Sequence, residues 1–185
     1  MTPRGHHRGN STERLLDKNL ILQGLDIQTG QTVLDVGCGN GYMTKVFSSL
    51  VGEEGQVYGL DRSVEAIEWL KNDRGDSNIE FLAGDITQKT ILEDNSIDLM
   101  YLSTVYHIFS HEEKAGFLRE AERIMKPKGK IAIIEIEKRD TPFGPPRERR
   151  VSPEELIDEM NLSPLALKKV GEYFYMQLLT VNRSV

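Results

Sequence analysis

The sequence is poor in cysteine and in long apolar runs. It contains one cysteine, Cys38, among 185 residues, so no disulfide within the chain and no cysteine-based zinc site is available. No apolar run approaches the roughly 20 residues that a membrane-spanning helix requires, and the first residues show no apolar stretch like that of a secretory signal. From these absences we expect a cytoplasmic protein without a membrane span.

Positive charge is also scarce. Lys and Arg number 23 against 29 for Asp and Glu, which gives a formal net charge of −6. A surface of this sign does not attract phosphate backbones over a long range, so nucleic acid is not expected as a partner, although composition alone leaves a local basic groove open. With 28% charged and 38% hydrophobic residues, the chain suits one globular domain over residues 1–185.

Strand-like runs rich in Val, Ile and Leu alternate with segments of helical periodicity. The lack of polar alternation indicates strands that are covered on both faces, and the order of elements is typical of βαβ units. We therefore expect an α/β protein with a single doubly wound, mostly parallel sheet. The predicted strands are Thr32–Val36, Gln56–Leu60, Ile79–Ala83, Ile97–Leu102 and Lys130–Glu137.

Several helix ends are marked by their residues. Ser110 with Glu113 predicts a capping box at the start of one helix. The run Lys126-Pro127-Lys128-Gly129 should end that helix, because it combines two strong helix breakers. Ser152, followed by Pro153 and Glu155, predicts the start of another helix.

The two ends of the chain flank a predicted cofactor-binding core over residues 29–137. An amphipathic helix is predicted over Ser11–Leu22, in an N-terminal segment (1–28) whose residues His6, His7 and Arg8 are a candidate lid. A long loop is predicted over 138–151, followed by a C-terminal helix and hairpin over 152–185. The hairpin, Leu167–Val181, has no room for a crossover helix and should therefore add antiparallel strands.

A glycine-rich turn joins the first predicted strand to a helix, in the run Val33-Leu34-Asp35-Val36-Gly37-Cys38-Gly39-Asn40-Gly41. Glycines let the backbone approach a ligand closely there. Tyr42 stands where a dinucleotide fingerprint places its third glycine, and Asp35 would oppose a pyrophosphate at the helix N-terminus. S-adenosylmethionine has no phosphate, and its ammonium and sulfonium groups suit a carboxylate. The turn therefore favours S-adenosylmethionine over a nicotinamide dinucleotide.

Two further acids follow the next two strands. Asp61 ends the second strand, where a carboxylate can accept both ribose hydroxyls of either cofactor class. Asp85 follows the third strand, where an acid can accept a proton from the adenine amino group. Taken singly, Asp61 is also explained as a helix cap and Asp85 as a turn former.

In order and spacing these motifs resemble the class I S-adenosylmethionine-dependent methyltransferases. More narrowly, they are similar to the small "methyltransferase domain" group that includes the quinone-pathway C-methyltransferases. The resemblance runs from about Thr29 to Glu137. It implies a Rossmann-like, mostly parallel sheet of seven strands with an antiparallel strand in the C-terminal hairpin. It also implies methyl transfer from S-adenosylmethionine, with S-adenosylhomocysteine as product and no metal. Because the sequence shows no extra domain that would bind a macromolecule, we expect a small-molecule acceptor.

The resemblance assigns roles to residues from the methionine end of the cofactor to its adenine end. By this carry-over, the methionine moiety is held by Asp35, Gly37, Cys38, Gly39, Gly41 and Ser103, the ribose by Asp61, and the adenine by Arg62, Asp85 and the backbone of Ile86. Cys38 is better read as a small turn residue than as a nucleophile, because no base is placed near it in the sequence.

Candidate catalytic residues follow the fourth strand, where open α/β sheets bind their ligands. His107 is predicted to act as a base or to orient the acceptor, and the competing interpretation is that it packs against the pocket or caps the next helix. Tyr106 is a second candidate, better suited to the pocket wall. Glu135 in the fifth strand faces either the site or a buried partner. The cluster Arg147-Glu148-Arg149-Arg150 would recognise an anionic substrate or form a solvated face.

Two other functions compete with methyl transfer. One is a non-catalytic module that binds S-adenosylmethionine, and the other, disfavoured by the turn, is a nicotinamide-dependent oxidoreductase. A single cysteine argues against arsenic methylation, and the Asn-Pro-Pro-Tyr motif of amino-methylating nucleic-acid enzymes is absent. The acceptor atom and the oligomeric state are left open by the sequence.

Overall fold

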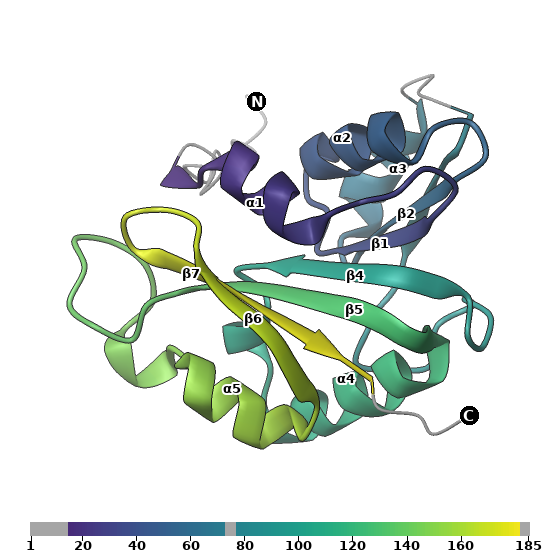
Figure 1. Cartoon of the computed structure of the whole chain (residues 1–185). Helices are drawn as coiled ribbons and strands as arrows, with labels where there is room; N and C mark the ends of the chain where they lie inside the picture. The colour runs from purple at the N-terminus through teal and green to yellow at the C-terminus, as the bar shows by residue number, and fades with distance from the viewer. Residues whose placement is uncertain (1–14, 73–76, 182–185) are drawn as a thin grey trace, which may run out of the picture.

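The computed structural model describes residues 15–72 and 77–181, and a seven-stranded sheet crosses its centre in the order β3-β2-β1-β4-β5-β7-β6 (Figure 1). Strands β1 to β5 run parallel, β7 runs antiparallel to β5, and β6 runs antiparallel to β7. The predicted α/β class, seven-stranded sheet and antiparallel C-terminal hairpin are therefore confirmed. The strands are β1 (Thr32–Val36), β2 (Gln56–Asp61), β3 (Ile79–Ala83), β4 (Ile97–Ser103), β5 (Met125–Ile136), β6 (Ser163–Lys169) and β7 (Phe174–Thr180).

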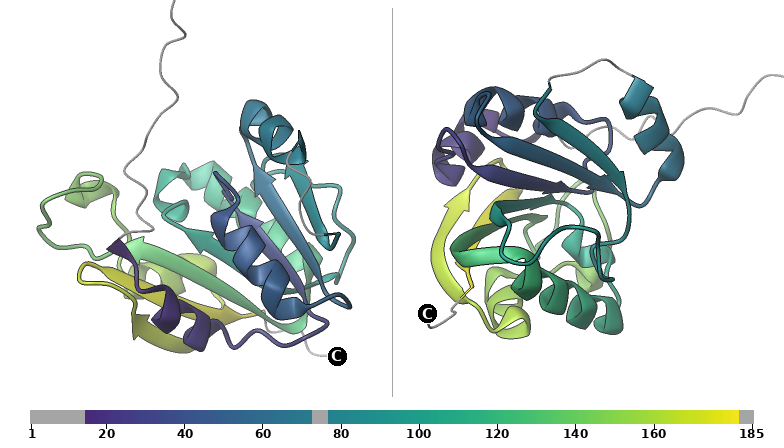
Figure 2. Two further views of the ribbon diagram at one scale, coloured as in Figure 1. Left: turned by 90° about the horizontal axis from the view of Figure 1, so that it is seen from above. Right: turned by 90° about the vertical axis from the view of Figure 1, so that its right-hand side faces the viewer.

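Helices cover both faces of the sheet. Figures 1 and 2 show α1, α2 and α3 on one side and α4 and α5 on the other. This arrangement explains why the central strands are apolar on both faces. The helices are α1 (Lys18–Leu25), α2 (Tyr42–Val51), α3 (Val64–Asn72), α4 (His111–Ile124) and α5 (Pro153–Met160), with single 3-10 turns at η2 (Tyr106–Ile108) and η3 (Arg147–Arg149). None of the helices in the described ranges is long and apolar enough to cross a membrane.

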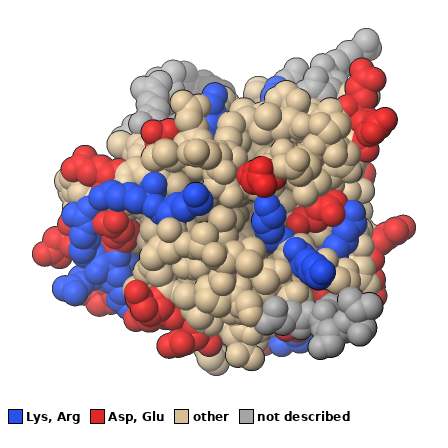
Figure 3. Space-filling model, viewed as in Figure 1, with Lys and Arg blue, Asp and Glu red and all other residues tan. Residues whose placement is uncertain are grey.

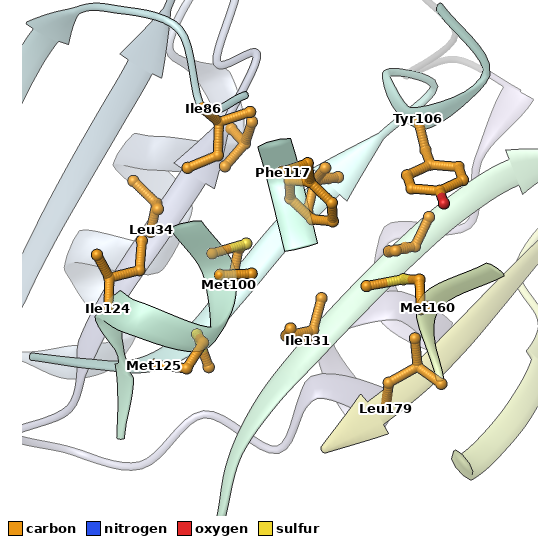
Figure 4. Close-up of a cluster of buried hydrophobic side chains, with 14 of the residues drawn as sticks. Leu34, Ile86, Met100, Tyr106, Phe117, Ile124, Met125, Ile131, Met160 and Leu179 are labelled. Carbon is orange, nitrogen blue, oxygen red and sulfur yellow. The ribbon is translucent and has the colours of Figure 1, made fainter. Parts of the chain in front are cut away.

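Two large apolar clusters fill the space between the sheet and its helices. The cluster on the α4 and α5 side, part of which is drawn in Figure 4, includes Phe117, Ile131 and Met160. The cluster on the α1 and α2 side includes Phe47 and Ile134. Successive residues of β5 thus face opposite clusters, as the pleat of a buried strand requires.

Both predicted capping boxes are present. Ser110 accepts from the backbone N–H of Glu113, whose side chain accepts in return from the N–H of Ser110, at 3.3 and 2.8 Å. Ser152 and Glu155 make the same pair of bonds at 3.2 and 2.8 Å. These boxes fix where α4 and α5 begin, because each satisfies N–H groups that the first helical turn leaves open.

Three predicted element boundaries are wrong. The N-terminal helix begins at Lys18 rather than Ser11, because Asp17 caps it by accepting from Asn19 N and Leu20 N; residues 11–14 lie outside the described residues. The run 126–129 ends α4 as predicted, but β5 begins at Met125 rather than Lys130, because this run belongs to the strand and bulges between its pairings with β4. The hairpin begins at Ser163, four residues before the predicted position.

Gly116 on α4 provides a test of this packing. A Cβ there would lie 2.1 Å from the backbone oxygen of Thr87, so Gly116→Ala must displace the loop after β3. Although helix propensity alone predicts a gain of about 0.5–1 kcal/mol, we expect a loss of about 1–3 kcal/mol in the free energy of unfolding because of overpacking. Urea unfolding measures the difference, with the exposed Arg119→Ala on the same helix expected to stay within about 0.5 kcal/mol. A stabilised Gly116→Ala variant would contradict this contact.

Candidate active site

The candidate site residues gather between β1 and β4, where the strand order of the sheet reverses. The chain leads from β1 to β2 on one side. On the other side, β4 lies next to β1, and the chain leads from β4 outward to β5. Ligands of open α/β sheets bind in the crevice that such a switch point opens at the carboxyl ends of the strands. The loops that follow β1, β2 and β4 therefore form the walls of the site.

The crevice is a trough made of two connected hollows. The first, of about 190 Å³, lies between the glycine turn and the start of α1, and its walls include Asp35, Tyr101 and Met43. The second, of about 330 Å³, runs past the ends of β2 and β3 and is mostly apolar. Gly37, Ser103 and Thr104 line both hollows, so one elongated ligand can occupy the two together.

The glycine turn forms the floor of the trough. Gly37, Gly39 and Gly41 have φ of 69°, 53° and 74°, values that L side chains rarely adopt. A Cβ at Gly37 would lie 2.6 Å from Val105. At Gly41 the nearest atoms belong to Leu70 and Phe81, so the structure does not bring this glycine to the trough, and its role is to fit the turn against α3 and β3.

Four backbone N–H groups of this turn already donate hydrogen bonds within the protein. Gly37 N and Cys38 N donate to Leu60 O at 2.7 and 3.2 Å, and Gly41 N donates to Cys38 O at 2.8 Å. Gly39 N donates to Asp61 Oδ2 at 3.0 Å. A dinucleotide turn instead directs its N–H groups at a pyrophosphate, so this turn is poorly arranged to bind one.

Asp35 lies at the end of β1 and is 3% exposed. Its Oδ2 accepts from the Thr44 hydroxyl at 2.6 Å. Thr44 lies in the first turn of α2 and is fully buried, so it positions the carboxylate at the wall of the first hollow. The sequence analysis missed Thr44, although a hydroxyl in the first helical turn after a strand-ending acid is a signal that could have found it.

Asp61 connects the turn to the second hollow. Besides Gly39 N, it accepts from Ser63 N at 2.9 Å through its other oxygen. One carboxylate therefore fixes the loop after β2 and the glycine turn relative to each other. Its wall position in the second hollow leaves it facing the ligand space.

Arg62 is the hub of a charged network at the outer end of the trough. It contacts Asp85 Oδ1 and Glu113 Oε1, each at 2.8 Å, and its guanidinium lies 5.6 Å from the centre of the Phe109 ring. Desolvation raises the pKa of Asp85, but hydrogen bonds from Thr87 and Arg62 outweigh it, so that this pKa lies below its usual value. The network ties the loops after β2 and β3 to the start of α4.

Asp85 and Ile86, although adjacent in the sequence, line different hollows. Ile86 and Gly84 line the second hollow, whereas Asp85 lines a smaller hollow of about 150 Å³ that shares Gly84 with it. The structure therefore brings Ile86 to the trough, as the resemblance implied, and turns the Asp85 side chain toward Arg62 and Thr87.

Cys38 is buried beneath the turn. It is 7% exposed, and burial, then the charges of Asp35 and Asp61, raise the pKa of its thiol well above the usual value. A protonated thiol is a poor nucleophile, which supports the interpretation of Cys38 as a turn residue.

Ser103 and Thr104, after β4, close the trough where the two hollows meet. Thr104 has a φ of 57°, unusual for a β-branched residue and a source of backbone strain. Its N–H donates to Ile134 O at 2.8 Å, which holds the strained peptide against β5. Nothing in the sequence marks this position, since the residues that favour such a φ are Gly, Asn and Asp.

His107 and Glu135 form a pair at the rim of the site. His107 Nδ1 lies 2.7 Å from Glu135 Oε2, and the His107 backbone N–H donates to Glu135 Oε1 at 3.1 Å. The Glu135 side chain is 1% exposed and that of His107 14%. Of the two alternatives for Glu135, the structure therefore shows a buried partner, and that partner is the candidate base.

Tyr106 is a residue of the apolar core. It is 1% exposed, and Figure 4 shows its ring at one end of the cluster that contains Phe117 and Met160. Its hydroxyl and Glu159 Oε2 are 3.0 Å apart, and burial followed by the Glu159 charge raises the pKa of the phenol. Both features argue against a catalytic role, because the ring does not line the trough and its hydroxyl holds its proton firmly.

A third hollow, of about 590 Å³, lies beyond the wall formed by Ile108 and Phe109. Its walls include His107, residues of α4 and α5, and the loop after β5. Figure 3 shows basic and acidic side chains mixed over the side of the molecule where this loop lies in Figure 1. His6, His7 and Arg8, the candidate lid, lie outside the described residues.

Arg150 holds the loop after β5 together. It is 6% exposed and donates to four backbone oxygens at 2.6–3.2 Å, those of Glu137, Arg139, Phe143 and Pro145. Its guanidinium is thus committed to the loop, and of the three arginines in the predicted anion-binding cluster only Arg147 and Arg149 have exposed side chains.

Arg150→Lys tests this organisation. A lysine has one ammonium group and cannot satisfy four carbonyls spread around a planar guanidinium. We expect amide hydrogen exchange across residues 138–149 to accelerate about tenfold, the equivalent of about 1.4 kcal/mol. The exposed Arg147→Lys, in the same loop, is the matched control. Unchanged exchange in Arg150→Lys would show that the loop is held by other contacts.

The low reactivity expected of the buried Cys38 thiol can be tested by alkylation. Because its thiol pKa is raised, we expect little reaction with iodoacetamide at mildly alkaline pH while the chain is folded, and rapid reaction in urea. Mass spectrometry of the single thiol measures both rates. Equal rates in the folded and unfolded chain, with folding confirmed by circular dichroism, would contradict the buried thiol.

Comparisons with known proteins agree with this geometry. A family model described as "Methyltransferase domain" matches residues 27–175. The chain is similar to a crystal structure of a SAM-dependent methyltransferase from Aquifex aeolicus, with a TM-score of 0.82, 31% identity and 93% of each chain covered.

Curated relatives match more locally. The ubiquinone/menaquinone biosynthesis C-methyltransferase UbiE of Pseudomonas savastanoi pv. phaseolicola is 32% identical over 65% of this chain and 48% of its own length. A protein-L-isoaspartate O-methyltransferase of Methanococcus maripaludis is 34% identical over 55% of this chain and 49% of its own. The chain spans about half the length of these curated relatives. The matched family, the sheet order and the Aquifex structure together establish that this chain belongs to the methyltransferase domain family of class I S-adenosylmethionine-dependent methyltransferases.

Proposed function

We propose that the chain transfers a methyl group from S-adenosylmethionine to a small-molecule acceptor bound in the third hollow. The observation that carries this proposal is the trough itself. It has a carboxylate at Asp35 and another at Asp61, on either side of a glycine turn in which four N–H groups are already bonded. Such a trough suits an elongated ligand that carries positive charge and no phosphate.

The first hollow fits the methionine moiety. Asp35 is a charged acceptor held by Thr44, and a buried carboxylate attracts an ammonium group strongly. Gly37, Gly39 and Ser103 expose backbone and small side chains to this hollow, so that the ligand lies directly against the chain. Cys38 contributes its position in the turn and no chemistry of its own.

The second hollow fits the adenosine moiety. Asp61 is placed to accept from the two ribose hydroxyls, and Leu60, Ile86 and Phe109 offer apolar surface to a planar base. Arg62 flanks this surface, held by its two ion pairs. In this proposal Asp85 acts mainly by fixing Arg62 and the loop, with the Ile86 backbone beside the adenine edge.

Catalysis by this site consists largely of alignment. S-adenosylmethionine supplies a methyl group on a positively charged sulfur, ready for displacement. The protein's part is to hold the acceptor in line with that methyl group, and good orientation of two reactants lowers a barrier by up to about 7–11 kcal/mol. The third hollow shares Ile108 and Phe109 with the second hollow, and this proximity to the trough supports its assignment to the acceptor.

Calorimetric titration with S-adenosylmethionine, S-adenosylhomocysteine and NADH tests the cofactor. We expect both adenosyl compounds to bind and NADH not to. Asp61→Asn should weaken adenosyl binding about 10–100-fold, because a charged hydrogen-bond acceptor is worth about 1.5–3 kcal/mol.

Asp158→Asn is the matched control, since Asp158 is exposed on α5 and lines neither hollow of the trough. Binding of NADH in place of the adenosyl compounds would overturn the proposal in favour of an oxidoreductase. Binding of S-adenosylmethionine without methyl transfer to any of a broad set of acceptors would favour a non-catalytic binding module.

A further inference from the structure

The His107 imidazole is fixed more firmly than a residue that merely lines a pocket. Both carboxylate oxygens of Glu135 contact His107: one accepts from its backbone N–H and the other lies against its Nδ1. Glu135 comes from β5 and is almost fully buried, so the carboxylate itself has little freedom to move. The ring orientation of His107 is therefore set by the sheet.

This contact also sets which ring nitrogen carries the proton. A carboxylate only accepts hydrogen bonds, so a neutral imidazole must donate from Nδ1 and keep its lone pair on Nε2. Nε2 itself makes no hydrogen bond to any residue in the described ranges, and no buried side-chain nitrogen or oxygen there lacks a partner. Nε2 is thus accessible, and His107 lines the third hollow.

The third hollow combines an apolar wall with a balanced charged rim. Ile108, Phe109 and Val151 form apolar surface suited to a planar ring. On the rim, Lys114 is 2.7 Å from Glu159, and Lys138 pairs with Glu155 at 2.5 Å. These two lysines are matched by carboxylates, and Arg149 and Glu148 add one further charge of each sign to the walls, so the hollow does not demand a highly charged ligand.

We propose that the methyl acceptor is a hydroxylated aromatic compound, that His107 Nε2 removes the proton of its hydroxyl group, and that Glu135 is the positioning residue for His107. This inference rests on the proposed function and deepens it by naming the substrate class. In its neutral form, His107 has the free lone pair, the access and the fixed orientation that a base needs.

The step balances without a further reactant. Nε2 takes the hydroxyl proton as the oxygen forms a bond to the methyl carbon. The carbon–sulfur bond breaks, and its electron pair stays on sulfur, which becomes a neutral thioether. The imidazolium that results is stabilised by the Glu135 carboxylate and returns its proton to water after the product leaves.

A base is required to activate a hydroxyl acceptor, whereas a neutral amine or a thioether does not need one. A phenol ionises with a pKa of about 10, so at neutral pH its oxygen is mostly protonated and weakly nucleophilic. A neutral amine or a thioether already presents a free lone pair, and would gain nothing from a fixed imidazole acceptor. The His107–Glu135 pair thus discriminates between classes of acceptor atom.

Nitrogen-15 NMR of the histidine rings tests the inference in the protein saturated with S-adenosylhomocysteine, near neutral pH. We expect His107 to show a protonated Nδ1 and an unprotonated Nε2. Glu135→Gln should mix the two tautomers, and Glu135→Asp should restore part of the wild-type pattern. A merely structural Glu135 would leave the tautomer unchanged. His107→Gln assigns the resonance, and His111→Gln, at an exposed position on α4, is the matched control.

Phenol, aniline and thioanisole, each added at the same millimolar concentration, then test the acceptor class. We expect phenol alone to shift the His107 Nε2 resonance. With S-adenosylmethionine, phenol should be converted to anisole, and His107→Gln should slow this conversion at least about 100-fold, whereas His111→Gln should not.

Three outcomes would overturn the inference: an Nε2 that is protonated at neutral pH, equal responses to aniline or thioanisole, and no response to any of the three probes. Calorimetry on the same samples separates these from failure of the proposed function. If S-adenosylhomocysteine still binds, any of these three outcomes rejects only the acceptor assignment. If the wild-type chain does not bind the adenosyl compounds, the cofactor assignment is rejected as well.

Discussion

Burial of the parallel strands on both faces is the constraint on which the rest of this structure depends. Once helices cover the two faces of β1 and β4, neither face can hold a ligand, and polar groups have room only where the strands end. Asp35, Asp61 and Ser103 each stand at the carboxyl end of a strand. Apolar residues along the strands and polar residues at their ends are thus two results of one packing arrangement.

The loops at this edge are held by side chains that accept or donate several hydrogen bonds each. Asp61 joins the loop after β2 to the glycine turn, and Arg62 joins the loops after β2 and β3 to α4. Arg150 does the same within the loop after β5. In each case a buried or half-buried charged side chain orders a backbone segment that has no regular secondary structure. Such side chains supply the hydrogen bonds that irregular segments need away from water.

Much of the fold could be predicted from the sequence because its signals are local. The apolar runs fixed the core strands, and Ser110 and Ser152 marked two helix starts through bonds to residues three positions later. The glycine turn and the acids at the ends of β1 and β2 could be located for the same reason. Where sequence reasoning failed, the deciding contact was distant or unusual. The pairing of His107 with Glu135 spans 28 residues, and the φ of Thr104 has no residue type that announces it. The departure of Asp85 from the trough depends on Arg62, 23 residues away, and the bulge at 126–129 depends on how β5 meets β4.

The placement of β7 between β5 and β6 has a consequence for how the chain is made. Residues of β5 pair with β7 in the register Lys130↔Thr180 to Ile136↔Phe174, so one edge of β5 lacks its partner until about residue 180 has left the ribosome. Strand β6 emerges earlier but occupies the outside of the sheet and has nothing to pair with in the meantime. Throughout this interval the nascent chain carries an apolar strand with an open edge, the feature that invites association with other chains. The open edge of β5 is therefore closed only when β7 has been made, later than the strands of the cofactor-binding core.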